Sequence, residues 1–258
     1  MLPSLYVSHG SPALMLMTNK TTCFLKSLPS TFDKPKYILV ISAHWTSNKL
    51  EILREQNQPL IYDFYGFPQE LYEQEYPARS DIEQENKIIQ LLKDFNIEIT
   101  ENKNRVGYDH GVWSVLSMMY PNADIPVIQL SLPMHYTIKQ LISLGAVLSS
   151  LREDTLILGS GSLTHNIRTS DYHKENAKAH TYAKEFRDWI VEKLENNEEE
   201  SLVNIQNEGP LLRENHPTLE HLLPLFINYG ASKNRIGKSL NNEYMYGNQA
   251  MDTILFEG

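Results

Sequence analysis

Tyr37-Ile38-Leu39-Val40-Ile41-Ser42-Ala43-His44-Trp45 is the stretch that decides the fold of this chain. Its first five residues form an unbroken apolar run rich in β-branched side chains, which is typical of a strand buried on both faces of a sheet. Such strands occur in parallel sheets that have helices packed on both sides. The stretch therefore predicts an α/β fold, with a histidine where a central strand ends.

Strand and helix signals alternate along the rest of the chain. Further strands are expected over residues 2–8, 50–53, 97–100, 126–132, 155–160 and 251–256. Helical periodicity predicts helices over residues 81–95, 111–120, 138–151, 176–200 and 218–229. This alternation predicts a mixed, mostly parallel central sheet with helices on both faces. No repeat, low-complexity linker or domain boundary interrupts the pattern, so we expect residues 1–258 to form a single domain.

The composition narrows the classes of function. The 258 residues carry a formal net charge of −9, which argues against nucleic acid or an anionic membrane as a partner. Cys23 is the single cysteine, so the sequence excludes an intramolecular disulfide and zinc-thiolate motifs. The first residues lack the pattern of a signal peptide, and no apolar stretch approaches the roughly 20 residues that cross a bilayer. We therefore expect a cytoplasmic protein; its oligomeric state is left open.

Five of the nine histidines stand where strands are expected to end or helices to begin, or lie beside Gly, Ser or Pro. They are His9, His44, His110, His165 and His221. Ligands of open α/β sheets bind at the carboxyl ends of the strands. Imidazole is the commonest metal ligand and titrates near neutral pH. The pattern predicts one metal-centred or acid–base site assembled from distant segments.

Each of these histidines also has a plainer interpretation. Taken alone, His9 or His44 fits a structural histidine, bonded to a carbonyl at the end of a strand, as well as it fits a site residue. Only their joint placement favours a shared site. His216 and His221 lack the i, i+4 spacing of a helical zinc pair, so at most one of them is expected to be a ligand. Arg168 could bind a substrate carboxylate or form a surface ion pair. The glycines before His165 lack the spacing of a phosphate loop.

Six short motifs, taken in order, carry a resemblance. They are Ser8–Pro12, Ser42–Trp45, Tyr62–Pro68, Asp109–Trp113, Gly161–Arg168 and His216–His221. Together they resemble the DOPA 4,5-dioxygenase-like branch of the class III extradiol ring-cleavage dioxygenases, the LigB-type superfamily. Each motif alone is weak, but the series extends over nearly the whole chain. The resemblance implies one catalytic α/β domain over residues 1–258.

The resemblance also implies a mononuclear divalent metal. The histidines that match the family's ligands are His9, His44 and His221, and His165 would be either a fourth ligand or an acid–base group. The family's better-known enzymes hold Fe(II) with two histidines and a glutamate, whereas His221 would give this chain three imidazoles. Three neutral imidazoles also suit Zn²⁺. We therefore expect Fe(II) for dioxygenase turnover and regard Zn(II) as compatible with the isolated protein.

The implied reaction is extradiol cleavage of a catechol, such as a DOPA-like compound, by O₂. His165 is expected to move protons, and His110 to stabilise an oxyanion on the substrate. Tyr65, Phe67 and Trp113 are expected to line an apolar pocket for the ring, with Arg168 as a further substrate contact.

Two other functions fit the same residues. One is a zinc-dependent hydrolase in which His165 or Glu220 activates water. The other is a non-catalytic metal-binding or redox-interaction protein, because fold-level analogy does not fix function.

Overall fold

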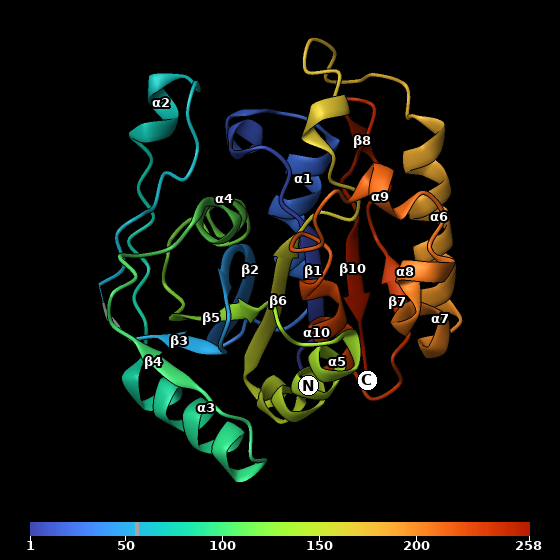
Figure 1. Cartoon of the computed structure of the whole chain (residues 1–258). Coiled ribbons are helices and arrows are strands. Elements are labelled where there is room, and N and C mark those ends of the chain that lie inside the picture. Colours follow the sequence, from blue (N-terminus) through green and yellow to red (C-terminus); the bar gives the residue numbers. More distant parts are fainter. Residues whose placement is uncertain (55–56) are drawn as a thin grey trace.

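Strand β2 (Tyr37–Ser47) lies in the middle of the main sheet, as its sequence predicts (Figure 1). Its side chains alternate between two hydrophobic cores: Leu39 and Ile41 belong to one, Ile38 and Val40 to the other. All four are fully buried. The computed structural model describes residues 1–54 and 57–258. Burial on both faces explains why this strand needs an unbroken apolar run.

The main sheet has the strand order β4-β3-β5-β2-β6-β1-β10-β7 in the described part of the chain. The other strands of this sheet are β1 (Ser4–Ser8), β3 (Glu51–Leu53), β4 (Thr100–Asn102), β5 (Val127–Pro133), β6 (Thr155–Gly161), β7 (Gly237–Ser239) and β10 (Thr253–Phe256). Neighbouring strands are parallel from β5 through β2 and β6 to β1, and antiparallel where β3 meets β5 and β10 meets β1 and β7. The predicted mixed, mostly parallel sheet is confirmed.

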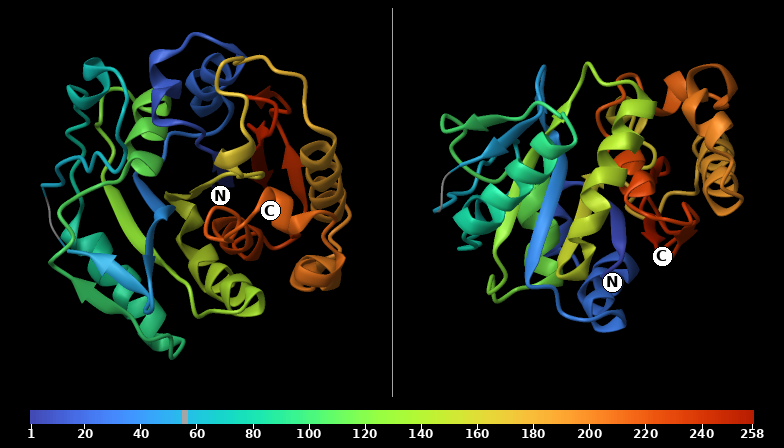
Figure 2. Two further views of the ribbon diagram at one scale, coloured as in Figure 1. Left: turned by 45° about the horizontal axis from the view of Figure 1, so that its top comes forward. Right: turned by 90° about the horizontal axis from the view of Figure 1, so that it is seen from below.

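Helices cover both faces of the sheet (Figure 2). One face packs against α3 (Ile82–Asp94), α5 (Ile138–Leu148), α6 (Thr181–Glu195) and α10 (Pro224–Gly230). The opposite face packs against η1 (Pro12–Leu16), α1 (Lys20–Ser27) and α4 (His110–Met119). The shorter elements are η2 (Leu28–Thr31), α2 (Gln69–Tyr72), η3 (Ser149–Glu153), η4 (Ile167–Thr169), α7 (Glu199–Val203), α8 (Ile205–Glu208), α9 (Leu212–Asn215) and the hairpin of β8 (Tyr244–Met245) and β9 (Gln249–Ala250). The predicted two-sided arrangement of helices is confirmed.

Several expected boundaries differ from the structure; for example, the helix expected over residues 176–200 is divided into α6 and α7, and two further differences affect the site. The helix expected over residues 218–229 begins only at Pro224, so His221 lies in the turns before α10. A proline favours the first turn of a helix because its ring fixes φ and it has no N–H to leave unpaired. The strand expected to end at His44 instead continues to Ser47, with a shift in register between Ile41 and Thr46. Such irregularities redirect side chains beside functional sites, and His44 lies within this one.

A buried arginine joins distant parts of the chain away from the carboxyl ends of the parallel strands. The Arg152 guanidinium donates hydrogen bonds to the carbonyls of Leu2 (2.8 Å), Ala231 (2.8 Å), Gly258 (2.7 Å) and Phe256 (3.2 Å). Both chain ends therefore lie on the same side of the sheet, at the bottom of Figure 1.

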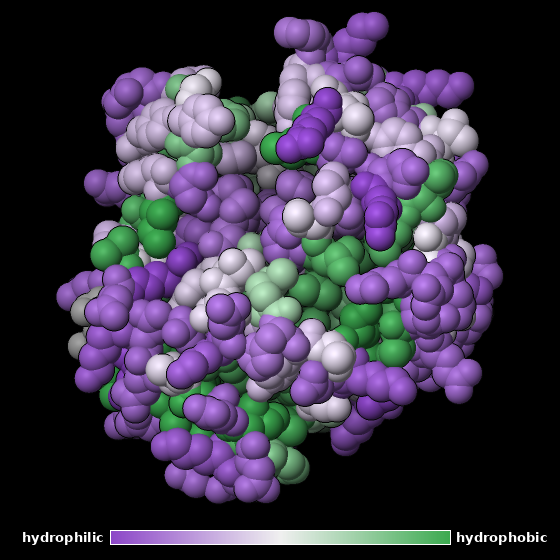
Figure 3. Space-filling model, viewed as in Figure 1, coloured by the Kyte–Doolittle hydropathy of each residue, from purple (hydrophilic) through white to green (hydrophobic). Residues whose placement is uncertain are grey.

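The outer surface is mainly hydrophilic on the face drawn in Figure 3, where hydrophobic residues show only in separate areas. Across residues 1–54 and 57–258, no helix has both the length and the apolar character to span a bilayer.

Candidate active site

All five histidines singled out from the sequence line one cavity of about 360 Å³. Each comes from a different segment: His9 follows β1, His44 lies in the irregular part of β2, His110 begins α4, His165 follows β6, and His221 precedes α10. The segments after β1 and β6 lie toward the top of Figure 1, at the carboxyl ends of the parallel strands. The fold thus brings together residues that are up to 212 positions apart in the sequence, from residue 9 to residue 221.

Hydrogen bonds fix the tautomer of His9. Its Nδ1 lies 2.9 Å from Ser160 Oγ, and the Ser160 hydroxyl donates its single hydrogen to the Gly111 carbonyl at 2.5 Å. Ser160 Oγ must therefore accept from His9 Nδ1–H. The Nε2 of His9 is left with a free lone pair. Burial, followed by the neighbouring imidazoles, lowers the pKa of His9 well below its ordinary value, so its ring is neutral.

His44 is oriented in the same way by a carboxylate. Its Nδ1 lies 3.0 Å from Asp63 Oδ2, and its Nε2 lies 3.2 Å from His9 Nε2. Burial disfavours the charged ring, but the hydrogen bond to Asp63 and the nearby carboxylates outweigh it and raise the pKa of His44. Two lone pairs that face each other at this distance cannot bond to one another. A shared proton or a metal cation between the two nitrogens resolves the conflict.

His221 supplies a third nitrogen of the same kind. Its Nδ1 lies 3.2 Å from Glu220 Oε1, while its buried Nε2 has no hydrogen-bond partner among the described residues. The His221 ring lies 5.3 Å from that of His9 and 5.0 Å from that of His44, measured between centroids. Burial, and then His165 and His44, lower its pKa well below the ordinary value. An unpaired buried nitrogen on a neutral ring fits a metal ligand, because its lone pair would otherwise be buried without a partner.

His165 packs flat against His221, with ring centroids 3.5 Å apart and planes at 10°. Burial lowers the pKa of His165 to about 4, against the opposing effect of Glu220. At neutral pH the ring is therefore uncharged and able to accept a proton. Nitrogen or oxygen atoms of His165, Glu220 and His221 lie within 4.8 Å of one another, as do those of His9, His44 and His110.

Asp63 joins two of the histidines, a role that the sequence analysis missed. Its Oδ1 accepts from His110 Nδ1 at 2.8 Å, and its Oδ2 accepts from His44 Nδ1 at 3.0 Å. Partial burial raises the pKa of Asp63, but the hydrogen bonds from His110 and His44 outweigh burial and hold it well below its usual range. The signal in the sequence was a carboxylate inside the motif Tyr62–Pro68, which had no assigned role.

A glycine allows α4 to approach the histidines. A Cβ at Gly111 would lie 2.5 Å from Ser42 Oγ and 3.2 Å from His44 Cδ2. Asp109, the residue just before α4, accepts from Ser42 Oγ at 2.6 Å and from Arg105 at 2.7 Å. These contacts hold the start of α4 against β2 and so place His110 beside His44, with ring centroids 4.0 Å apart.

The predicted substrate contacts occupy different environments. Phe67 lines the cavity, together with Phe64, whose ring lies 5.7 Å from that of His110. Trp113 does not line it, because its fully buried indole donates to the Ile61 carbonyl at 3.1 Å. Tyr65 is 92% exposed, and Arg168 is exposed on η4; neither lines the cavity. The sequence analysis did not single out the further lining residues Ile167, Tyr172, Tyr246 and Gln249.

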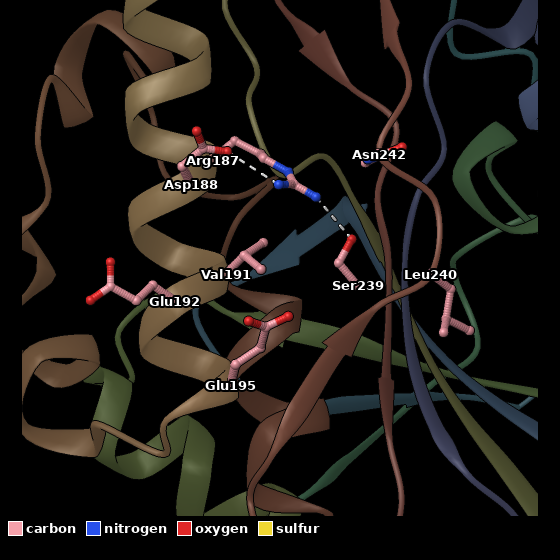
Figure 4. Close-up of a pocket in the computed structure, with 8 residues that line it drawn as sticks. All are labelled: Arg187, Asp188, Val191, Glu192, Glu195, Ser239, Leu240 and Asn242. Atoms are coloured by element: carbon pink, nitrogen blue, oxygen red, sulfur yellow. Dashed lines mark hydrogen bonds and ion pairs between the residues drawn. The ribbon is translucent and has the colours of Figure 1, made fainter.

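A second hollow, between α6 and the residues around β7, offers no comparable chemistry (Figure 4). Figure 4 shows Arg187 extending from α6 toward Ser239, with Asp188 beside it. Two guanidinium nitrogens of Arg187 also donate to the buried Asp252 at 2.7 and 3.0 Å. Among the described residues that line this hollow, Arg187 is the one cationic side chain and is already paired, and none is a histidine.

A cluster of buried imidazoles at the carboxyl ends of an α/β sheet is typical of an enzyme that depends on a single metal ion. The profile of the LigB family, described as the catalytic LigB subunit of aromatic ring-opening dioxygenase, matches residues 3–254. The chain belongs to this family. The predicted class of enzyme, an extradiol aromatic ring-opening dioxygenase with a histidine-ligated mononuclear metal, is confirmed.

Individual relatives extend over most of the chain. The chain is 36% identical to the 4,5-DOPA dioxygenase extradiol of Escherichia coli K12, over 89% of this chain and 85% of that protein. It is 35% identical to the protein of the same name from Beta vulgaris, over 88% of this chain and 85% of that protein. The crystal structure of an uncharacterized protein from Escherichia coli K12 has a TM-score of 0.82 and 29% identity, and covers 100% of both chains. These similarities favour ring opening over hydrolysis and over non-catalytic metal binding.

Proposed function

We propose that this dioxygenase opens catechols and that it holds Fe(II) through the Nε2 atoms of His9, His44 and His221. The observation that carries the proposal is that each of these three rings has its Nδ1 occupied by a protein partner. Hydrogen bonding of the second ring nitrogen is the usual means by which proteins orient a metal-ligating histidine. The relatives named as DOPA dioxygenases support a catechol as the substrate class.

Bound Fe(II) would supply a Lewis acid for the two catechol oxygens and a redox centre for O₂. Zn(II) fits the same three neutral imidazoles and would compete for them, because availability as well as preference determines which metal a site holds.

His165 is the proposed acid–base residue. Its pKa of about 4 keeps the ring neutral at pH 7, so it can take a proton from a catechol hydroxyl and return it later in the reaction. Its flat packing on His221 directs the ring edge, which carries the two nitrogens, away from the His221 face. We therefore assign His165 to proton transfer rather than to a fourth position on the metal.

The tautomer of His110 determines how this residue would contact the substrate. Because its Nδ1 donates to Asp63, the neutral ring presents an Nε2 lone pair, which accepts a hydrogen bond. Only after this nitrogen takes a proton does it donate to an oxyanion on the substrate. The ionised Asp63 would stabilise the resulting imidazolium, as carboxylate partners of catalytic histidines do.

The cavity wall formed by Phe64 and Phe67 would hold the aromatic ring and keep water from it. Their rings meet edge to face with centroids 5.3 Å apart, an arrangement that aromatic pairs favour. We also propose that residues 1–258 act as one catalytic domain in the cytoplasm, with a small aromatic compound and O₂ as the partners.

The test is anaerobic loading with Fe(II), followed by measurement of O₂ uptake and of a yellow ring-opened product across a panel of catechols. Stoichiometric O₂ consumption that depends on iron and is lost in His165→Ala supports the proposal. Fully iron-loaded protein that binds catechols yet consumes no O₂ contradicts it.

A further inference from the structure

One part of the cavity wall contains no histidine and reaches the protein surface. We call it the mouth wall: Ile167, Tyr172, Tyr246 and Gln249. Ile167 is 55% exposed and Tyr172 is 51% exposed, whereas Tyr246 and Gln249 are buried. The Tyr172 and Tyr246 rings lie 5.1 Å apart. A side chain on a catechol whose ring lies between the histidines and the phenylalanines would extend toward this wall.

The lysines and arginines of the chain lie outside the lining of the cavity, as far as the described residues show. Among the described residues that line it, none is lysine or arginine. Arg168, the candidate suggested by the sequence, is exposed on η4 and outside the lining. A carboxylate that leaves water for a largely apolar wall loses hydration without gaining an ion pair.

Two acidic residues adjoin the mouth wall through backbone hydrogen bonds. The Glu175 carbonyl accepts from the Tyr246 backbone N–H at 2.9 Å, which places this glutamate beside the tyrosine. Burial first, and then the negative charge of Glu175, raise the pKa of Tyr246. Asp171 adjoins the same turn, because its backbone N–H donates to the Tyr246 carbonyl at 2.9 Å. The negative charge of Glu175 would disfavour an approaching carboxylate, whereas the Asp171 carboxylate already has His180 Nε2 as a partner at 3.0 Å.

Tyr246 is held in this wall by a backbone conformation that few side chains adopt. It has φ of 53° in the turn between β8 and β9, and the next residue, Gly247, has φ of 76°. A left-handed conformation costs a non-glycine residue on the order of 1 kcal/mol, and such residues cluster at binding and catalytic sites. The backbone bonds to Asp171 and Glu175 hold the turn in place. Contacts within the protein therefore hold the backbone that carries the Tyr246 ring.

The hydrogen-bonding groups of the mouth wall are uncharged. Gln249 donates from Nε2 to Ser170 Oγ at 3.3 Å, and its Oε1 is an acceptor. The Tyr246 hydroxyl can donate or accept. These two residues can satisfy an alcohol or an amide, but they cannot neutralise a carboxylate.

We propose that Tyr246 and Gln249 determine specificity, and that the cavity selects catechols with an uncharged side chain over those with a carboxylate. This inference rests on the proposed function, because it takes catechol cleavage at the histidine cluster as given. It departs from the amino acid named for the curated relatives, whose substrate carries a carboxylate.

The test compares two probes of nearly equal size, 3,4-dihydroxyphenylacetamide and 3,4-dihydroxyphenylacetate, at pH 7 with the iron-loaded protein. We expect kcat/KM to be at least about tenfold higher for the amide, since a buried unpaired charge is costly. The dissociation constant measured without O₂ should favour the amide in the same direction. This binding measurement is independent of turnover.

Two variants locate the selectivity. Gln249→Arg places a guanidinium in the mouth wall and should raise kcat/KM for the acetate relative to the amide by at least about tenfold. Arg168→Ala is the matched control, because it removes an arginine outside the lining, and it should leave the ratio of the two probes unchanged. Selective loss of acetate binding in Arg168→Ala would overturn the inference.

The remaining outcomes separate this inference from the proposed function. If both probes are opened but the acetate is equal or better in kcat/KM and in binding, the selectivity inference is wrong and catechol cleavage stands. If neither probe nor any other catechol of the panel is opened by iron-loaded protein, the proposed function is wrong and the inference falls with it.

Discussion

The His165 ring lies flat on the His221 ring, with centroids 3.5 Å apart and planes at 10°. Histidines that share one metal ordinarily direct nitrogen atoms, not ring faces, toward a common point. The stacking therefore supports the proposed division of roles, in which His221 is a ligand and His165 is a group that transfers protons.

The first prediction separates these roles by metal content. His221→Ala should lose most of the bound metal, because it removes one of the three proposed ligands. His165→Ala should keep at least half of the metal while kcat falls by about 100-fold or more, the range that general acid–base catalysis supplies. Metal analysis after dialysis, together with steady-state kinetics, checks both. Equal loss of metal in the two variants would show that His165 is a ligand.

The second prediction concerns Asp63, which orients His44 and His110 together. Asp63→Asn keeps the shape but removes the negative charge and one of the two acceptor oxygens. Loss of such partners typically lowers metal affinity or activity by about 10- to 100-fold. We expect the variant to bind metal more weakly and to have lower kcat. The far-UV circular dichroism of Asp63→Asn should match that of the parent protein; a collapsed spectrum would instead assign Asp63 to folding.

The third prediction tests the close approach of α4 to β2. Gly111→Ala forces a methyl group to within 2.5 Å of Ser42 Oγ and 3.2 Å of His44 Cδ2. Overpacking of this kind costs about 1–3 kcal/mol in the free energy of unfolding. We expect a lower unfolding midpoint in urea and weaker metal binding. The control on the same helix is Ser117→Ala, which removes only a hydrogen bond to the Trp113 carbonyl and should have a much smaller effect.

The fourth prediction concerns acid sensitivity, for which His216 is the clearest case. Its Nε2 donates to the Leu163 carbonyl at 2.9 Å, its Nδ1 has no partner among the described residues, and burial lowers its pKa to about 4. The unfolded chain binds this proton near pH 6.5 and the folded chain only near pH 4. The neutral ring therefore contributes stability that is complete above pH 6.5 and is lost as the pH falls toward 4.

The lowered pKa of His216 corresponds to a loss of about 3 kcal/mol in the free energy of unfolding once the pH has fallen below both pKa values. Chelator-treated protein should unfold at lower urea concentration at pH 5 than at pH 7. His216→Gln, which retains a donor for the Leu163 carbonyl, should reduce this difference. Unchanged pH dependence in the variant would show that the other buried histidines account for the whole acid effect.

The sheet and the gathering of the histidines followed from the sequence for a physical reason. Buried strands such as β2 need unbroken apolar runs, and parallel strands bring their carboxyl ends to one edge, so histidines placed after several strands must meet there. The start of α10 was mispredicted because the apolar spacing of residues 218–223 also suits a series of turns, and only Pro224 marks the helix start.

The rest of the site depends on tertiary contacts that no local pattern encodes. Trp113 looked like a pocket residue, but its indole N–H finds a partner in the buried Ile61 carbonyl. Asp63 acquires its role only when two histidines from β2 and α4 reach its two oxygens. Tyr246 and Gln249 come from a hairpin near the end of the sequence, far from every motif that drew attention to the site.

The buried guanidinium of Arg152 has a consequence for how the molecule opens. Its contacts with Leu2 and Phe256 connect the strands β1 and β10, which lie at opposite ends of the sequence and pair directly in the sheet. Separation of either strand would break hydrogen bonds of the Arg152 guanidinium and leave a buried cation and its carbonyl acceptors without partners. The two strands therefore form one cooperative unit. Their backbone amides should exchange with deuterium at the same slow rate, which is that of global unfolding, while the hairpin of β8 and β9 exchanges through smaller, local openings.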